Sequence, residues 1–342
     1  MSRSVVAAMT AYTLELREAE IKLNQNESPF DFPRELKERV LARMAERPWN
    51  LYPDFESTAL RTAIAKAQDL APENILVGNG SNELLAAAIG AFVGPGTPVV
   101  FPRPTFALYE KLVTIAGGLP IPIEFDPDSG LLPLDGMLDA IAKHQDPVAI
   151  VCSPNNPTGG VLPEGGLEAL LRSGAMVLLD RAYGDFDSLV AGFSRPNLVT
   201  FRTFSKAWGL AALRVGWLTS TAENCREIRK VKLPYSLNVI SEAIAALALE
   251  HREIRDQNVE RIVAERERVF AAMQSIPKIR VFPTRANFIT FRTPLPLFDA
   301  LWARGILVRD LSGYPRLQGC LRVSIGTREQ NDAFLAALEE AV

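Results

Sequence analysis

The sequence predicts a doubly wound α/β domain followed by a smaller α+β domain. Three observations support this expectation. Short β-branched runs alternate with helical patterns from about residue 56 to 220, which is typical of a parallel sheet covered by helices on both faces. After Thr221 a long helical pattern leads into short strands. The length of 342 residues exceeds the size at which one hydrophobic core keeps growing.

The elements follow from hydrophobic periodicity and from turn residues. In the first domain we expect strands at 75–77, 99–101, 148–152, 176–180, 199–204 and 215–218, and helices at 82–92 and 106–116. A helix is expected at 34–45, a long one at about 253–273, and strands at 279–282 and 288–291. The predicted domains are 46–221 for the large one, and 1–45 with 222–342 for a discontinuous small one that carries an N-terminal arm.

Composition excludes several classes of protein. Hydrophobic residues make up 48% and charged residues 23% of a chain with a net charge of −3, which favours a globular enzyme over a disordered or nucleic-acid-binding chain. The longest apolar run, 84–93, is about half the ~20 residues of a membrane-spanning helix. Three scattered cysteines and two histidines in charged helical surroundings indicate neither a disulfide framework nor a metal site. We therefore expect a cytoplasmic enzyme without a metal.

A lysine after a predicted strand is the first candidate for catalysis. Lys206 lies in the segment TFSKAWGL, after Thr203 and Ser205 in the chain and before Arg214. A desolvated lysine has a lowered pKa and offers a neutral amine that can form an imine. The hydroxyls and Arg214 could hold a dianionic phosphate. Taken alone, the dipeptide Ser-Lys more often marks a solvated loop, so other residues must support the assignment.

Asp180 and Tyr183 give that support at the end of the predicted strand 176–180. An aspartate at the carboxyl end of a parallel strand points into the crevice where α/β proteins bind ligands, and there it could keep a pyridine nitrogen protonated. Tyr183 could donate to the phenolate oxygen of such a ring, and Asn156 in the turn SPNNPTG could bond that oxygen from the other side. A helix-capping aspartate and a plain strand exit remain the alternatives for each segment by itself.

The segment GNGSNE at 78–83 closes a predicted strand and opens a helix. Backbone N–H groups at a helix start form an anion site, and the glycines with Ser81 suit a phosphate ester. The segment is neither a Walker loop nor a complete GxGxxG motif.

Together these residues supply the contacts that a pyridoxal 5'-phosphate (PLP) cofactor requires, in the order Gly80, Ser81, Asn82, Phe106, Asn156, Asp180, Tyr183, Ser205, Lys206 and Arg214. On them the chain resembles the fold type I PLP enzymes, aminotransferase class I and II, and within these the histidinol-phosphate aminotransferases, over nearly its whole length. The segments that carry the resemblance are LNQNE (23–27), YPD (52–54), SPNNPTG (153–159), SKA (205–207) and GCLRVSIGTR (319–328). The resemblance implies a mostly parallel seven-stranded sheet.

The resemblance also implies a role for each matching residue. Lys206 would form the internal aldimine, Asp180 would pair with the pyridine nitrogen, and Tyr183 and Asn156 would bond the phenolate. The cofactor phosphate would be held by Ser81, Asn82, Ser205, Arg214 and the backbone at Gly80.

The resemblance implies two more cofactor contacts and a substrate site. Phe106 would stack on the ring, and Tyr52 would reach the phosphate from the neighbouring subunit of a homodimer. Arg322, with Arg309 and Tyr12, would bind the substrate phosphate, and Asn26 of the LNQNE segment belongs to the same substrate site.

Three positions depart from the family pattern. Arg181 follows Asp180 where glutamate is usual, Phe106 replaces a tyrosine, and Asn82 replaces a frequent aspartate. None of these changes removes a proton carrier. We expect Arg181 to pair with a surface carboxylate rather than to change substrate preference.

The implied reaction is ping-pong transamination, in histidine biosynthesis, of L-histidinol phosphate with 2-oxoglutarate to imidazole acetol phosphate and L-glutamate. Three alternatives remain open: an aromatic amino acid aminotransferase, a decarboxylase of the threonine-phosphate type, and a non-catalytic protein that keeps the fold. The presence of both Lys206 and Asp180 argues against the last.

Overall fold

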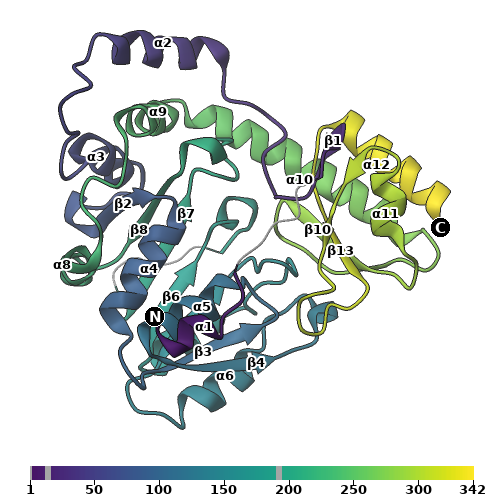
Figure 1. The fold of residues 1–342 in the computed structure, drawn as a ribbon, viewed down its shortest axis with the longest axis horizontal. Coiled ribbons are helices and arrows are strands. Elements are labelled where there is room, and N and C mark those ends of the chain that lie inside the picture. Colours follow the sequence, from purple (N-terminus) through teal and green to yellow (C-terminus); the bar gives the residue numbers. More distant parts are fainter. Residues whose placement is uncertain (1, 12–16, 190–194) are drawn as a thin grey trace.

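The computed structural model describes residues 2–11, 17–189 and 195–342, and a seven-stranded sheet lies at the centre of this part of the chain (Figure 1). The strand order is β2-β8-β7-β6-β5-β3-β4, and β8 alone runs antiparallel to its neighbours. The strands are β2 (Ile75–Asn79), β3 (Pro98–Arg103), β4 (Leu119–Glu124), β5 (Val148–Cys152), β6 (Met176–Asp180), β7 (Leu198–Thr203) and β8 (Val215–Thr219).

Helices cover both faces of this sheet, as its sequence requires. All five residues of β5 are buried, and successive ones belong to different cores: Ile150 packs with residues of α4 and α5, and Val151 with residues of α6 and α7. Such continuous burial explains why the central strands read as uninterrupted apolar runs. The helices concerned are α4 (Ser81–Phe92), α5 (Leu108–Ala116), α6 (Leu134–Ile141) and α7 (Gly166–Arg172).

A second sheet of four antiparallel strands, in the order β12-β13-β10-β9, lies to one side of the first (Figure 1). Its strands are β9 (Arg280–Val281), β10 (Phe288–Arg292), β12 (Arg309–Asp310) and β13 (Cys320–Ser324), packed with α10 (Arg252–Gln274), α11 (Leu297–Trp302) and α12 (Arg328–Ala341). A capping box between Thr327 and Gln330 begins α12. β1 (Ile21–Lys22) pairs in parallel with β11 (Ile306–Leu307), which ties the N-terminal segment to this unit.

The remaining helices lie on the large sheet's side. α8 (Ala222–Val231) contacts α4, and α9 (Val239–Glu250) contacts both α2 (Arg34–Ala45) and α3 (Thr58–Ala67). Residues 222–250 were assigned to the small domain in the predicted division, which itself stays a prediction. Short elements complete the described chain: α1 (Ser4–Ala7) and the 3₁₀ helices η1 (Pro72–Asn74), η2 (Pro127–Ser129), η3 (Gly184–Phe186) and η4 (Ala211–Leu213).

The predicted α/β fold is confirmed, and most predicted boundaries lie within two residues of the observed ones. The sequence reasoning gave no strand for β4, whose sequence LPIPIE holds two prolines. Proline cannot donate to a ladder, and β4 tolerates it because it is an edge strand with one neighbour, β3. Within the described residues, no helix is both long and apolar enough to cross a membrane.

Candidate active site

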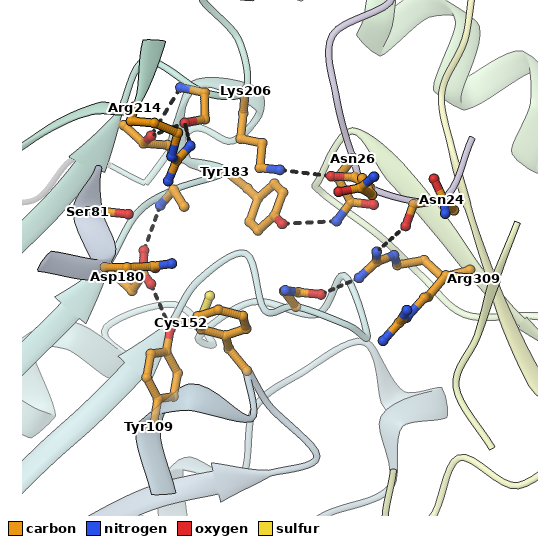
Figure 2. Close-up of a pocket in the computed structure, with 18 of the residues that line it drawn as sticks. Asn24, Asn26, Ser81, Tyr109, Cys152, Asp180, Tyr183, Lys206, Arg214 and Arg309 are labelled. Carbon is orange, nitrogen blue, oxygen red and sulfur yellow. Dashed lines mark hydrogen bonds between the residues drawn. The ribbon is translucent and has the colours of Figure 1, made fainter. Parts of the chain in front are cut away.

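A cavity of about 210 Å³ opens at the carboxyl ends of the central strands, between the two sheets (Figure 2). Strands β5 and β6 are paired so that Cys152 lies opposite Asp180, which brings the residues after both strands to the same edge. The N-terminus of α4, the segment between β1 and α2, and residues of the second sheet complete the walls. The lining residues are Asn24, Gln25, Asn26, Ser81, Asn82, Phe106, Tyr109, Cys152, Asn156, Asp180, Ala182, Tyr183, Thr203, Ser205, Lys206, Arg214, Arg309, Tyr314 and Arg322.

Lys206 projects into this cavity from the turn after β7. The turn is held by the buried Phe204, which packs against Trp208 and Trp217, and by a bond from Leu210 N to Phe204 O of 3.0 Å. The amine donates to the carbonyl of Gln25 at 3.0 Å. Burial, followed by the charge of Arg322, lowers the pKa of Lys206 to about 7. A large share of the side chain is therefore a neutral amine at pH 7, as a nucleophile or base requires.

Asp180 is the last residue of β6 and lines the same cavity as Lys206 (Figure 2). Tyr109 Oη donates to its Oδ2 at 2.7 Å, and the backbone N–H of Ala182 donates to its Oδ1 at 2.9 Å. Burial raises the pKa of Asp180, and these two hydrogen bonds act in the opposite direction. The carboxylate is thus oriented by two donors while it remains accessible from the cavity.

Tyr183 and Asn156 line the same cavity, and each contacts a residue from outside the large sheet. Asn26 Nδ2 donates to the hydroxyl of Tyr183 at 2.9 Å. Arg322 Nη1 donates to Asn156 Oδ1, and its Nη2 donates to the carbonyl of Asn24 at 2.9 Å. The side chains predicted to bond one ring oxygen are therefore held by the N-terminal segment and by β13.

The start of α4 and the turn before β8 form a site that suits a phosphate. Gly80 has a φ of +78°, and a Cβ there would lie 2.6 Å from Arg214 Nη2, so glycine lets the guanidinium approach the helix start. A Cβ on Gly216 would lie 2.3 Å from Ser81 N. Arg214 Nη1 also donates to Ser205 Oγ at 3.2 Å. A helix N-terminus, hydroxyls and a guanidinium thus converge.

The structure brings most of the predicted site residues together. Of the fifteen, twelve line the cavity, and Gly80 lies beside it under Arg214. Tyr52 does not line it: its side chain is 78% exposed and stacks on Tyr235 with ring centroids 4.6 Å apart. Tyr12 lies outside the described residues.

The expectation for Arg181 was wrong about its surroundings. It pairs with a carboxylate, Asp187, at 2.8 Å, but both side chains are buried, with exposed fractions of 2% and 9%. The guanidinium also donates to the carbonyls of Ser153, Gly184 and Leu189. It therefore faces away from the cavity and fastens the end of β6 to neighbouring loops. The sequence does not reveal that Arg181 is buried, because most of its acceptors are backbone carbonyls, which every residue carries.

Several lining residues were not predicted, among them Tyr109, Cys152, Asn24 and Tyr314, whereas Thr203 had been suggested as one of the phosphate-holding hydroxyls. The signal for Tyr109 was its spacing: it lies three residues after Phe106, which would put both on one face of the predicted helix 106–116. In the structure Phe106 precedes α5, and the two rings meet edge to face at 5.6 Å. Cys152 was interpreted as core, and it is buried, but it also contributes to the cavity wall.

Comparison with known proteins decides the family. The family model of aminotransferase class I and II matches residues 18–338. The chain belongs to this family. It is 37% identical to a histidinol-phosphate aminotransferase of Aquifex aeolicus, over 98% of this chain and 97% of that protein. It is also 37% identical to one of Thermococcus gammatolerans, over 94% of this chain and 91% of that protein. These matches confirm the predicted resemblance.

Solved structures agree on the fold of this aminotransferase. A histidinol-phosphate aminotransferase from Sinorhizobium meliloti, in complex with pyridoxal-5'-phosphate, has a TM-score of 0.87 and 24% identity, covering 99% of this chain and 96% of that one. An L-threonine-O-3-phosphate decarboxylase from Porphyromonas gingivalis has a TM-score of 0.81 and 21% identity, covering 94% and 98%. The fold is thus shared by enzymes that cleave different bonds, and it cannot choose among them.

Family membership confirms that the chain is a transferase and that its cofactor is PLP. The residues of the cavity fit that cofactor. The donor set around Ser81, Ser205 and Arg214 suits its phosphate, and the carboxylate of Asp180 suits its pyridine nitrogen. The lowered pKa of Lys206 suits attachment of its carbonyl carbon.

Proposed function

We propose that this aminotransferase moves the amino group of L-histidinol phosphate to 2-oxoglutarate, giving imidazole acetol phosphate and L-glutamate in histidine biosynthesis. One observation carries the substrate class: guanidinium groups lie at both ends of one cavity. Arg214 stands at the cofactor phosphate end and Arg309 at the other (Figure 2), and Arg322, the register partner of Arg309 on β13, lines the same cavity. The pair of guanidinium groups at this second end suits an anion on the substrate, because arginine binds phosphate and carboxylate oxygens with paired donors.

The residues of the chain have separable tasks in this reaction. Bound PLP supplies a protonated ring that withdraws the electron pair left at the substrate Cα. Lys206 would be the attachment point of the cofactor at rest, and its freed amine would take the proton from the substrate Cα and carry it toward the cofactor. Asp180 holds the proton on the ring nitrogen. Tyr183 and Asn156 orient the ring through its phenolate oxygen.

Both substrates must use the same anion site. Histidinol phosphate places its phosphate at the end of the cavity far from Arg214, and 2-oxoglutarate would place its distal carboxylate there. Arg322 already donates to Asn156 and to the Asn24 carbonyl, so substrate binding would exchange some of these bonds for bonds to the anion. The exchange would link substrate binding to the position of Asn156.

We further propose a cytoplasmic homodimer in which Tyr52 contributes to the cofactor phosphate site of the partner. Tyr52 is exposed, and other large apolar side chains near it are exposed as well, namely Leu51, Phe55 and Leu233. Such a patch suits an interface. Sedimentation of the purified protein, compared with that of Leu233→Glu, would test the assembly. A monomeric wild type that retains full activity would refute it.

A half-reaction tests the proposed activity directly. Purified holoenzyme is mixed with L-histidinol phosphate without 2-oxoglutarate, and the visible absorption of the cofactor is followed. Conversion of the cofactor to its amine form within one turnover is expected. Tryptophan, phenylalanine and threonine phosphate are tested in parallel. Release of carbon dioxide from threonine phosphate, with no conversion by histidinol phosphate, would show that the chain is a decarboxylase instead.

A further inference from the structure

Tyr109 contacts Asp180, and none of the roles described so far uses this contact. It lies in the first turn of α5, and its side chain is fully buried. Its hydroxyl donates to Asp180 Oδ2 at 2.7 Å, while its ring meets Phe106 edge to face. The residue therefore contacts both the carboxylate predicted to pair with the ring nitrogen (Figure 2) and the side chain predicted to stack on the ring.

The direction of this hydrogen bond is fixed by its surroundings. Burial and the charge of Asp180 raise the pKa of Tyr109 well above its ordinary value, so the phenol keeps its proton and acts as the donor. The neighbouring Cys152 thiol donates elsewhere, to the carbonyl of Pro154 at 3.2 Å. Arg181, the nearest guanidinium in sequence, donates to Asp187 and to backbone carbonyls. Tyr109 and the Ala182 N–H are thus the donors that orient Asp180.

We propose that Tyr109 is a positioning residue whose hydroxyl, by donating to Asp180, keeps the shared proton of the Asp180–pyridine hydrogen bond on the ring nitrogen. The inference uses the cofactor of the proposed function and does not depend on which amine is the substrate. Tyr109 would in this way control how strongly the cofactor ring withdraws electrons.

The physical reason is a competition at one carboxylate. Burial favours the neutral form of Asp180, and a neutral carboxyl would leave the pyridine nitrogen without its proton. A hydrogen bond donated to the carboxylate makes it a weaker base, which shifts the shared proton toward the nitrogen. Without the hydroxyl, Asp180 becomes the stronger base and takes the proton. The ring is then neutral and accepts electrons from the substrate Cα less well.

The test measures the protonation of the ring nitrogen rather than the enzyme activity. Wild type and Tyr109→Phe are reconstituted with PLP labelled with ¹⁵N in the ring, and the ¹⁵N chemical shift is recorded without substrate. The wild-type signal should lie in the range of a protonated pyridine, and the Tyr109→Phe signal should move toward that of the unprotonated ring. Tyr183→Phe is the matched variant at the other end of the ring, and it should leave the ¹⁵N signal near the wild-type position.

An unchanged ¹⁵N shift in Tyr109→Phe, even with weaker cofactor binding or lower stability, would overturn the proposal, because a purely structural role predicts that result. If the variant binds too little cofactor, the apoproteins are labelled with [γ-¹³C]aspartate, and Asp180 is assigned from its absence in Asp180→Asn. Its titration midpoint should rise in Tyr109→Phe, and an equal midpoint would again overturn the proposal. A wild type that binds no PLP would instead refute the proposed function.

Discussion

The two ends of the cavity are built in different ways. At the ring-nitrogen end, Asp180 and Tyr109 come from elements of one sheet and its covering helix, are buried, and already bond each other. At the substrate end, Arg309 and Arg322 belong to the second sheet, and Arg322 reaches across to Asn156 of the first. The ring-nitrogen end is therefore built by the first sheet and its covering helix, whereas the substrate end depends on how the two sheets meet. Variants at the two ends should consequently fail in different ways.

Lys206→Ala should give the largest effect, because it removes both the attachment point and the base. General base catalysis alone contributes about 10²- to 10⁴-fold, so kcat should fall by at least roughly 10³-fold while the fold is retained. Single-turnover kinetics with histidinol phosphate measure the loss. Reduction with borohydride should fix the cofactor to wild type and not to the variant, as mass spectrometry can show. A variant with wild-type turnover would rule out the role of Lys206.

Arg181→Leu should be the most destabilising change at the cofactor end. The substitution removes the cationic partner of Asp187 and the donor to the carbonyls of Ser153 and Leu189. Breaking a buried pair in this way costs about 3–5 kcal/mol of the free energy of unfolding. Urea unfolding of the apoprotein measures it. The control is Arg34→Ala, whose pair with Glu38 is on the surface and contributes about 0–1 kcal/mol. Equal losses in both variants would contradict the buried network.

The same contrast explains what the sequence could predict. Asp180 ends an apolar strand, Asn156 and Lys206 lie in the turns that follow two others, and the carboxyl ends of neighbouring strands meet at one edge. Their convergence is therefore a consequence of local pattern and topology. Arg309 and Arg322 were placed by the family resemblance, since no local rule brings the second sheet to that edge. Tyr109 was missed because its partner is 71 residues away and a helical tyrosine ordinarily indicates packing.

Arg322→Lys should weaken substrate binding with little effect on the cofactor. A charge-assisted hydrogen bond is worth about 1.5–3 kcal/mol, so KM for histidinol phosphate should rise by roughly 10- to 100-fold. For an amine without an anionic end, such as phenylalanine methyl ester, kcat/KM should change much less. Arg214→Lys is the matched control: it should raise the dissociation constant of PLP, measured by equilibrium dialysis, and leave KM nearly unchanged. If both variants raised KM alike, the two ends would not be separate sites.

The smallest expected effect couples the two ends through the amine of Lys206. Its pKa of about 7 lies below the ordinary value of 10.5 because of burial first and the charge of Arg322 second. The neutral amine is the reactive form, so the rate of PLP attachment to the apoenzyme should rise with pH, be half-maximal near pH 7, and then level off. Arg322→Gln removes one of the charges that disfavour the protonated amine, and the midpoint should therefore move to higher pH. Stopped-flow absorbance from pH 6 to about 9 measures both curves. A wild-type rate that keeps rising through this range would indicate a solvated lysine. Equal midpoints in the two proteins would show that the charge of Arg322 does not affect the pKa of Lys206.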